Sequence, residues 1–293
     1  MRGIAKESIL SGSGMSAVSL IQVPGWEQFG WLWHGFSTRM GGVSRVYLVD
    51  PEGDAGGDLN LGFTDLDDRE AVRENRRRFV EALTGSGEAP LSLVRQVHSN
   101  RSIAIQAAAI TATDGCLAQP GAVEADGLMS DEPGKLVGVL TADCIPVLVA
   151  DSEHRAVAAF HAGWRGTVER IVELGVARMQ EIYGSDPAQM VAAIGPGISV
   201  CCYTVGDEVR QRFGERFPYA EELFTMRQDD SGEPEMRLDL TEANRRQLLD
   251  AGLKAETIAV VGGCTSCQPE RFFSHRASGG RTGRMMAAIG VRG

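Results

Sequence analysis

The sequence lacks any apolar run that approaches the roughly 18 residues a membrane-spanning helix needs. Its opening stretch, MRGIAKESILSGSGMSAV, has no continuous apolar segment and therefore does not predict a signal peptide. Basic residues are in deficit, with 29 Lys and Arg against 39 Asp and Glu and a net charge of −10. Because an acidic surface repels phosphate backbones and anionic lipids, we expect neither a nucleic-acid nor a membrane partner.

Cysteine is also scarce, with six residues in a chain of 293. This density is too low for a disulfide scaffold, and without a secretion signal we expect reduced thiols and a cytoplasmic protein. The sequence is 43% hydrophobic and 23% charged, which is ordinary for a soluble globular protein. Its length allows a sizeable core, so neither a disulfide bond nor a bound metal is needed for the chain to fold.

No internal repeat or clean linker divides the chain. We predict a flexible N-terminal extension over residues 1–20 and a single catalytic domain over residues 21–293. Short apolar, partly β-branched segments predict buried strands at 136–141, 145–150 and 156–160. RFFSHR and RMMAAIGV are predicted to form a closing hairpin.

Three helices are also predicted. DDREAVRENRRRFVEALTG has Gly85 as its stop, and TVERIVELGVARMQEIYG has Thr167 as a candidate N-cap and Gly184 as its stop. TEANRRQLLDAGL is the third. Because strands come in groups between isolated helices, the pattern favours an α+β sandwich over regular βαβ alternation.

The stretch ADCIPVLVADSEHRAVAAFHAGWRGTV holds one Cys and two His in a buried-looking run. The residues between its two strands suit a four-residue hairpin loop, which pairs Ala150 with Arg155 and places Cys144 opposite His161. Opposed residues have Cβ atoms about 4.5–5.5 Å apart on one face of a sheet, close enough to hold one ion. A slip of one residue would put the two side chains on opposite faces.

A thiolate and an imidazole at that distance suit zinc, and a catalytic zinc needs a third protein ligand. His98 is the best candidate by residue type, and it ends the segment SLVRQVH, whose alternation predicts a strand. Two other interpretations remain open. Cys144 and His161 suit a nucleophile and its base, as in cysteine hydrolases, or Cys144 is a core residue beside two unrelated histidines.

The other cysteines carry weaker signals. Cys264 and Cys267 form a C-x-x-C pair without a second such pair, which favours a packing role. Cys201 and Cys202 are vicinal, an arrangement that rarely forms a disulfide.

Histidine and glycine patterns elsewhere allow simpler interpretations. We interpret His34 and His154 as surface residues. In HAGWRG, two glycines precede a helix, where backbone amides can hold an anion with help from Arg165; alternatively, the glycines only make the turn. Asp143 is interpreted as a structural group beside Cys144 on the opposite face of a strand.

Eight motifs occur in order: FSTRMGGVS, DLNLG, RQVHSN, ADGLMS, TADCIPVLVAD, HAGWRGTV, AAIGPGISVCCYTVGDEV and FFSHRASGGRTGRM. Together they resemble the YfiH-like family, also called the multicopper polyphenol oxidase (laccase-type) or peptidoglycan editing factor family. TADCIPVL followed by HAGWRG is highly specific to it. The resemblance implies a single-domain layered α/β/β/α sandwich of mixed, largely antiparallel sheets.

The resemblance also implies a function. Members of the family are regarded largely as purine nucleoside phosphorylases with adenosine deaminase side activity. The expected substrates are phosphate and adenosine, inosine, guanosine or methylthioadenosine, giving the free base and ribose 1-phosphate. A catalytic zinc held by His98, Cys144 and His161 is implied as well.

Substrate contacts are predicted outside this trio. Arg39, in FSTRMGG, and Arg276 suit phosphate because guanidinium matches phosphate oxygens bidentately. Asn60, in DLNLG, is assigned to the same group of contacts. The sequence departs from the family pattern at Thr204, where an acid is usual, and at Ala277, where a second Arg is usual.

Three rival functions stay open. A copper-dependent polyphenol oxidase needs many His, and the five in this chain cannot supply a trinuclear cluster, although copper binding in vitro is allowed. A peptidoglycan-precursor editing amidase or cysteine hydrolase would use the same Cys and His. A metal-holding scaffold without activity would need a closed four-ligand site. We expect a monomer or weak homo-oligomer.

Overall fold

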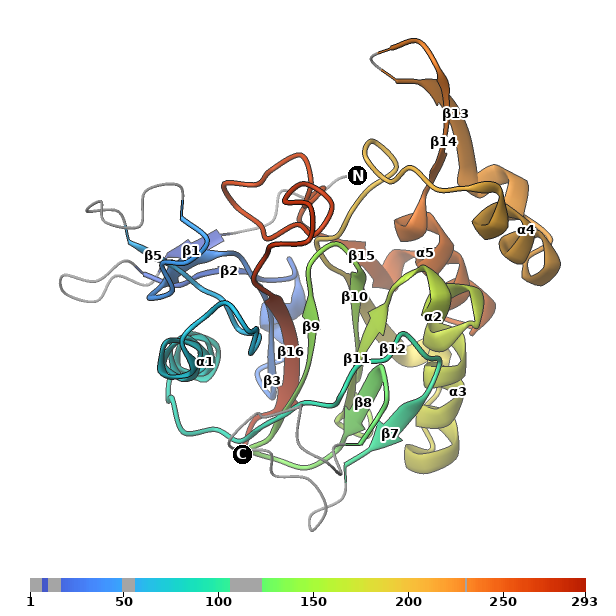
Figure 1. The fold of residues 1–293 in the computed structure, drawn as a ribbon. Coiled ribbons are helices and arrows are strands. Elements are labelled where there is room, and N and C mark those ends of the chain that lie inside the picture. Colours follow the sequence, from blue (N-terminus) through green and yellow to red (C-terminus); the bar gives the residue numbers. More distant parts are fainter. Residues whose placement is uncertain (1–6, 10–16, 49–55, 106–122, 230) are drawn as a thin grey trace.

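The computed structural model describes residues 7–9, 17–48, 56–105, 123–229 and 231–293, and Figure 1 shows two mixed β-sheets packed face to face. The first sheet has the order β1-β2-β3-β16-β9-β6. Its strands are β1 (Glu7–Ile9), β2 (Ser19–Ile21), β3 (Leu32–Ser37), β6 (Leu91–Ser92), β9 (Leu136–Thr141) and β16 (Met285–Val291).

The second sheet has the order β15-β12-β10-β11-β8-β7. Its strands are β7 (Ser102–Ala104), β8 (Gly127–Ser130), β10 (Ile145–Asp151), β11 (Ala156–Ala162), β12 (Met190–Ile194) and β15 (Ile258–Val260). Two short ribbons lie outside these sheets: β4 (Met40–Gly42) with β5 (Gly57–Asp58), and β13 (Phe224–Gln228) with β14 (Pro234–Leu238).

Helices complete the described elements. The α-helices are α1 (Arg69–Thr84), α2 (Trp164–Val168), α3 (Ile171–Tyr183), α4 (Asp207–Arg216) and α5 (Leu240–Asp250). Single turns of 3-10 helix are η1 (Trp26–Gln28), η2 (Pro187–Gln189), η3 (Ala220–Leu223) and η4 (Ala255–Thr257). Among the described residues, no helix is long and apolar enough to cross a membrane.

The layers follow from where the apolar side chains point. Between the sheets, Val137 and Ile289 of the first pack with Leu148 and Val157 of the second. Helix α1 covers the outer face of the first sheet, and α3 and α5 cover the outer face of the second (Figure 1). Since alternate strand residues face opposite sides, each sheet buries both faces. The predicted α/β/β/α sandwich is confirmed.

Most predicted elements form as expected, but one helix is interrupted. Asp68 caps α1 by accepting hydrogen bonds from two backbone amides, and Gly85 ends it with a φ of 83°. The predicted cap Thr167 lies instead inside α2, buried, with its hydroxyl directed to the carbonyl of Ala162. Arg170, at a φ of 62°, separates α2 from α3, so the prediction of one helix capped by Thr167 was wrong.

The hairpin that carries the candidate site has a different register from the one predicted. Asp151 pairs with Ala156, and Pro146 rather than Cys144 lies opposite His161. Asp151 accepts hydrogen bonds from two loop amides and so holds the loop at 152–155. The register moves by two residues, which preserves the side-chain alternation. Cys144 directly precedes β10, and its side chain lines the same cavity as that of His161.

Two predicted strands are absent. In SLVRQVH only Ser92 belongs to a strand, β6. Farther along, the side chain of Gln96 bonds both backbone groups of Leu140 at 2.8 Å in place of a ladder. His98 has a φ of 61°, which a regular strand does not allow. FFSHR is a turn region, so β16 pairs with β3 and β9 instead of forming a hairpin with it.

The predicted domain boundary at residue 20 falls inside a strand. Ser19–Ile21 forms β2, which pairs with β1 and β3, so part of the expected N-terminal extension belongs to the first sheet. Residues 1–6 and 10–16 lie outside the described residues.

Candidate active site

A cavity of about 600 Å³ opens beside the start of β10 and the end of β11. This volume lies within the usual range for small-molecule sites. Its lining includes His98, Cys144, His161, Trp164, Tyr203 and Arg276. The three predicted metal ligands therefore share one cavity wall with two aromatic side chains and a cation.

The ligand atoms of His98, Cys144 and His161 lie within 4.8 Å of one another. The sulfur of Cys144 is 3.9 Å from Nε2 of His98, and the rings of His98 and His161 meet edge to face with centroids 5.0 Å apart. His161 is buried, Cys144 is partly exposed and His98 is exposed. Two imidazoles and one thiol at this spacing form a group that can hold a metal ion.

Asp126, which the sequence analysis assigned no role, organises this group. Its buried carboxylate lies 2.9 Å from Nδ1 of His161 and accepts hydrogen bonds from the backbone amides of Val97, His98 and Ser99. A ring nitrogen that donates to a carboxylate leaves the other nitrogen free for a metal. The only sequence signal was ADGLMS, where an acid directly precedes a buried strand.

Burial and neighbouring groups shift the pKa values of Cys144, His161 and Asp126. Burial raises the pKa of the Cys144 thiol, but the neighbouring histidines outweigh burial and lower that pKa to about 6. Burial lowers the pKa of His161, but Cys144 and Asp126 outweigh it and raise that pKa to about 9. Burial likewise raises the pKa of Asp126, whereas hydrogen bonds from His161 and Ser99 lower it to about 2.

Gly163 makes room for the three ligands. A Cβ at this position would lie 2.9 Å from the sulfur of Cys144 and 3.1 Å from the His98 ring. The glycine of HAGWRG is therefore required by close approach of the metal-binding group. The backbone at Gly163 has an ordinary φ of −68°, so the close contact, and not the turn from β11 into α2, favours glycine here.

Asp143 ties the site to a distant loop. It lies in a turn before β10 with a φ of 92°, so its predicted position on a strand face was wrong. Its carboxylate accepts hydrogen bonds from the hydroxyl of Thr265 at 2.6 Å and the backbone amide of Arg276 at 2.7 Å. The predicted structural role beside Cys144 agrees with these contacts.

Of the predicted substrate contacts, Arg276 lines the cavity, whereas Arg39 and Asn60 do not. Arg39 forms a bidentate pair with Asp58, at 2.8 and 2.5 Å, and lies over the ring of Phe273. Asn60 is fully buried and accepts a hydrogen bond from the backbone amide of Arg284. It thus supports a second cavity arginine that the sequence analysis missed.

The departures from the family pattern lie beside the cavity rather than in it. The hydroxyl of Thr204 donates to Glu235, and its carbonyl accepts a hydrogen bond from Arg276 at 3.2 Å. Ala277 lines a smaller neighbouring hollow with Arg39. His34, interpreted as a surface residue, is buried and accepts a hydrogen bond from the amide of Val23, so that interpretation was wrong.

The sequence matches a known protein family. The family described as multi-copper polyphenol oxidoreductase laccase matches residues 33–292. The chain belongs to this family. The chain has five histidines, and of these only His98 and His161 lie in the candidate metal-binding group with Cys144.

Relatives of this family member have been named for nucleoside chemistry. The chain is 38% identical over 260 residues to purine nucleoside phosphorylase YlmD of Geobacillus stearothermophilus, covering 88% of this chain and 89% of that protein. It is 35% identical over 199 residues to adenosine deaminase RL5 of an unknown prokaryotic organism, covering 68% and 74%. The crystal structure of the Geobacillus YlmD matches with a TM-score of 0.80 and 34% identity, over 98% of this chain and 100% of that one.

Proposed function

We propose that the protein is a zinc-dependent purine nucleoside phosphorylase, with adenosine deaminase as a second activity. The observation that carries the proposal is the placement of His98, Cys144 and His161 on the wall of a cavity of about 600 Å³. The relatives named for these two activities support it.

The donor set fits zinc better than copper. One thiolate and two imidazoles are ligands that zinc prefers, and three protein ligands leave a coordination position for substrate. A trinuclear copper cluster would need many more histidines than this group contains. When bound, zinc supplies Lewis acidity to groups in the cavity.

The chain's own residues provide binding and orientation. Trp164 and Tyr203 offer aromatic faces against which a purine can pack. Arg276 and Arg284 bring positive charge to the same cavity and suit phosphate. In phosphorolysis a phosphate oxygen forms the bond to the ribose carbon while the bond from that carbon to the purine nitrogen breaks. The purine takes the electron pair and then a proton.

The test is product analysis with and without phosphate. Metal-assayed protein is incubated with adenosine, inosine or methylthioadenosine, and the products are separated by chromatography. We expect base release that requires phosphate and yields ribose 1-phosphate. Equal base release in phosphate-free buffer would indicate a hydrolase instead. Inosine formed from adenosine without phosphate would identify the deaminase activity.

A further inference from the structure

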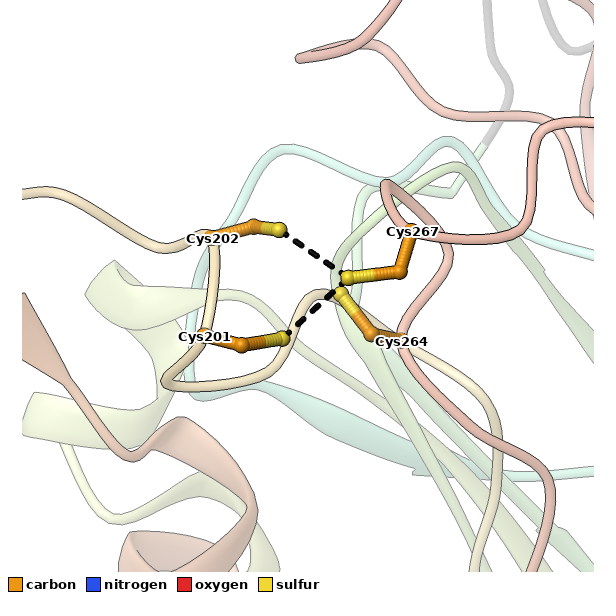
Figure 2. Close-up of side chains that lie close together, drawn as sticks. All are labelled: Cys201, Cys202, Cys264 and Cys267. Carbon is orange, nitrogen blue, oxygen red and sulfur yellow. Dashed lines mark hydrogen bonds between the residues drawn. The ribbon is translucent and has the colours of Figure 1, made fainter. Parts of the chain in front are cut away.

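Four cysteine thiols converge at a second place in the structure, outside the trio of His98, Cys144 and His161. Cys201 and Cys202 lie in the loop after β12, and Cys264 and Cys267 lie in the loop after β15. Figure 2 shows their sulfur atoms pointing toward one another from the two loops. All four sulfurs lie within 4.8 Å of one another, and none forms a disulfide.

The sulfur spacing is slightly shorter than that of tetrahedral zinc coordination. The sulfur of Cys267 is 3.4 Å from that of Cys201 and 3.2 Å from that of Cys202. A zinc–sulfur bond of about 2.3 Å in a tetrahedron places sulfurs about 3.8 Å apart. A shift of each sulfur by a few tenths of an ångström would bring these two distances to that value.

The backbone around the cluster holds the thiols together. Cys264 forms a parallel bridge with Gly197, and the amide of Thr265 donates to the carbonyl of Gly197 at 3.1 Å. The amide of Ser199 donates to the sulfur of Cys264 at 3.4 Å, a contact that favours a thiolate there. The C-x-x-C turn therefore does have a second pair of cysteines. This pair is Cys201 and Cys202, which lie 66 and 65 residues before Cys267.

We propose that Cys201, Cys202, Cys264 and Cys267 bind a second, structural zinc ion. Four sulfur ligands close the coordination shell, which is typical of a structural rather than a catalytic zinc. The donor set is also soft enough to exclude magnesium and calcium, which require oxygen ligands. The inference does not depend on the reaction proposed for the cavity.

The second zinc would join two loops that form the cavity wall. Arg276 lines the cavity, and its guanidinium donates to the carbonyls of Cys202 at 3.3 Å and Thr204 at 3.2 Å. On the other loop, Thr265 lies between two of the cysteines and donates to Asp143, the neighbour of Cys144. The zinc therefore fixes the distance between the loops that carry Tyr203 and Arg276.

A disulfide is the competing use of these thiols. Cys201 and Cys267 are exposed, so an oxidant can reach them. Each disulfide would join two of the cysteines and consume their thiols, whereas zinc would engage all four sulfurs without oxidising them. The two states differ in metal content and in thiol reactivity, which separates them in one experiment.

The experiment counts zinc in the full-length protein, purified without added metal or oxidant. We expect two zinc ions per chain in the wild type by elemental analysis. The double variant Cys201→Ser/Cys267→Ser should lose one, and His98→Ala/His161→Ala should lose the other. Ser266→Ala, in the same turn as Cys264 and Cys267 but with all four thiols intact, should keep both.

X-ray absorption at the zinc edge of the wild type makes the test independent of how the variants fold. One four-sulfur site beside one site with a single sulfur gives about 2.5 sulfurs per zinc, against about one if only the His98 site is filled. Native thiol titration should find the four cysteines protected until a chelator is added. A single zinc per chain with one sulfur, or a disulfide within the cluster by mass spectrometry, would overturn the proposal.

Discussion

Oδ1 of Asp126 lies 2.9 Å from Nδ1 of His161, and this contact fixes which ring nitrogen faces the metal-binding group. The same carboxylate accepts the amides of residues 97–99, which hold His98 at a φ of 61°. One buried acid therefore orients a ligand on a strand and a ligand on a loop. Without it, neither the tautomer of His161 nor the position of His98 would be determined.

Replacing Asp126 should weaken the metal site without removing a ligand. In Asp126→Asn the acceptor charge is lost, and partners of this kind typically contribute 10- to 100-fold in metal affinity. We expect a zinc dissociation constant raised by about that factor, measured by competition with a chromogenic chelator. Asp131→Asn, at an exposed acid, is the matched control. Unchanged affinity in Asp126→Asn would refute the role assigned to this carboxylate.

A single methyl group at position 163 should disrupt the same site sterically. In Gly163→Ala the Cβ would lie 2.9 Å from the sulfur of Cys144, closer than real contacts allow. We expect loss of the zinc held by His98, Cys144 and His161 and of activity, while the far-ultraviolet circular dichroism spectrum is retained. Gly214→Ala, where nothing lies within 4 Å, should behave like the wild type. Full zinc in Gly163→Ala would show that the site tolerates the methyl group.

Cys144 should react with iodoacetamide only when the metal is removed. Its pKa of about 6 in the metal-free protein makes it a thiolate above that pH and a thiol below it. Because thiolates are the reactive species, alkylation of chelator-treated protein should rise as pH increases through about 6. Mass spectrometry of the modified peptide measures it. Rapid alkylation in fully zinc-loaded protein would favour the cysteine-hydrolase mechanism.

Replacing Arg276 should weaken phosphate binding, whereas replacing Arg39 should lower stability. Arg276→Ala removes a cation from the cavity, and a charge-assisted contact contributes about 1.5–3 kcal/mol, so we expect KM for phosphate to rise about 10- to 100-fold. Arg39→Lys breaks the bidentate pair with Asp58, which should lower Tm but leave KM for phosphate within about twofold. Steady-state kinetics and thermal unfolding measure both. The reverse result would restore Arg39 as the phosphate contact.

Buried His34 should make the protein sensitive to acid. Burial lowers its pKa from 6.5 to about 4, so the unfolded chain takes up a proton at pH values where the folded protein does not. This contribution to stability is complete above pH 6.5 and declines as pH falls toward 4, by about 3 kcal/mol. Urea unfolding between pH 7 and 4 should show the decline. It should shrink in His34→Gln and persist in His275→Gln, a change at an exposed histidine.

The sequence by itself predicted an α+β sandwich and a shared site for Cys144 and His161, with His98 as the candidate third ligand; the family resemblance implied the layers and the complete trio. Strands at 136–141, 145–150 and 156–160 and the capped helix α1 follow from local apolar patterns and caps, which act over a few residues. Cys144 and His161 come together because one hairpin joins them. The observed register differs from the predicted one by two residues, a shift that leaves each strand residue on its predicted face.

Only the tertiary structure decided the contacts made across the fold. Asp126, directly before the neighbouring strand β8, contacts His161, and Asn60 supports Arg284 from 224 residues away. Cys202 reaches Cys267 from a different loop, which turned an apparently lone C-x-x-C into half of a four-thiol cluster. No local pattern encodes these pairs, because their partners are selected by how the two sheets and their connecting loops pack.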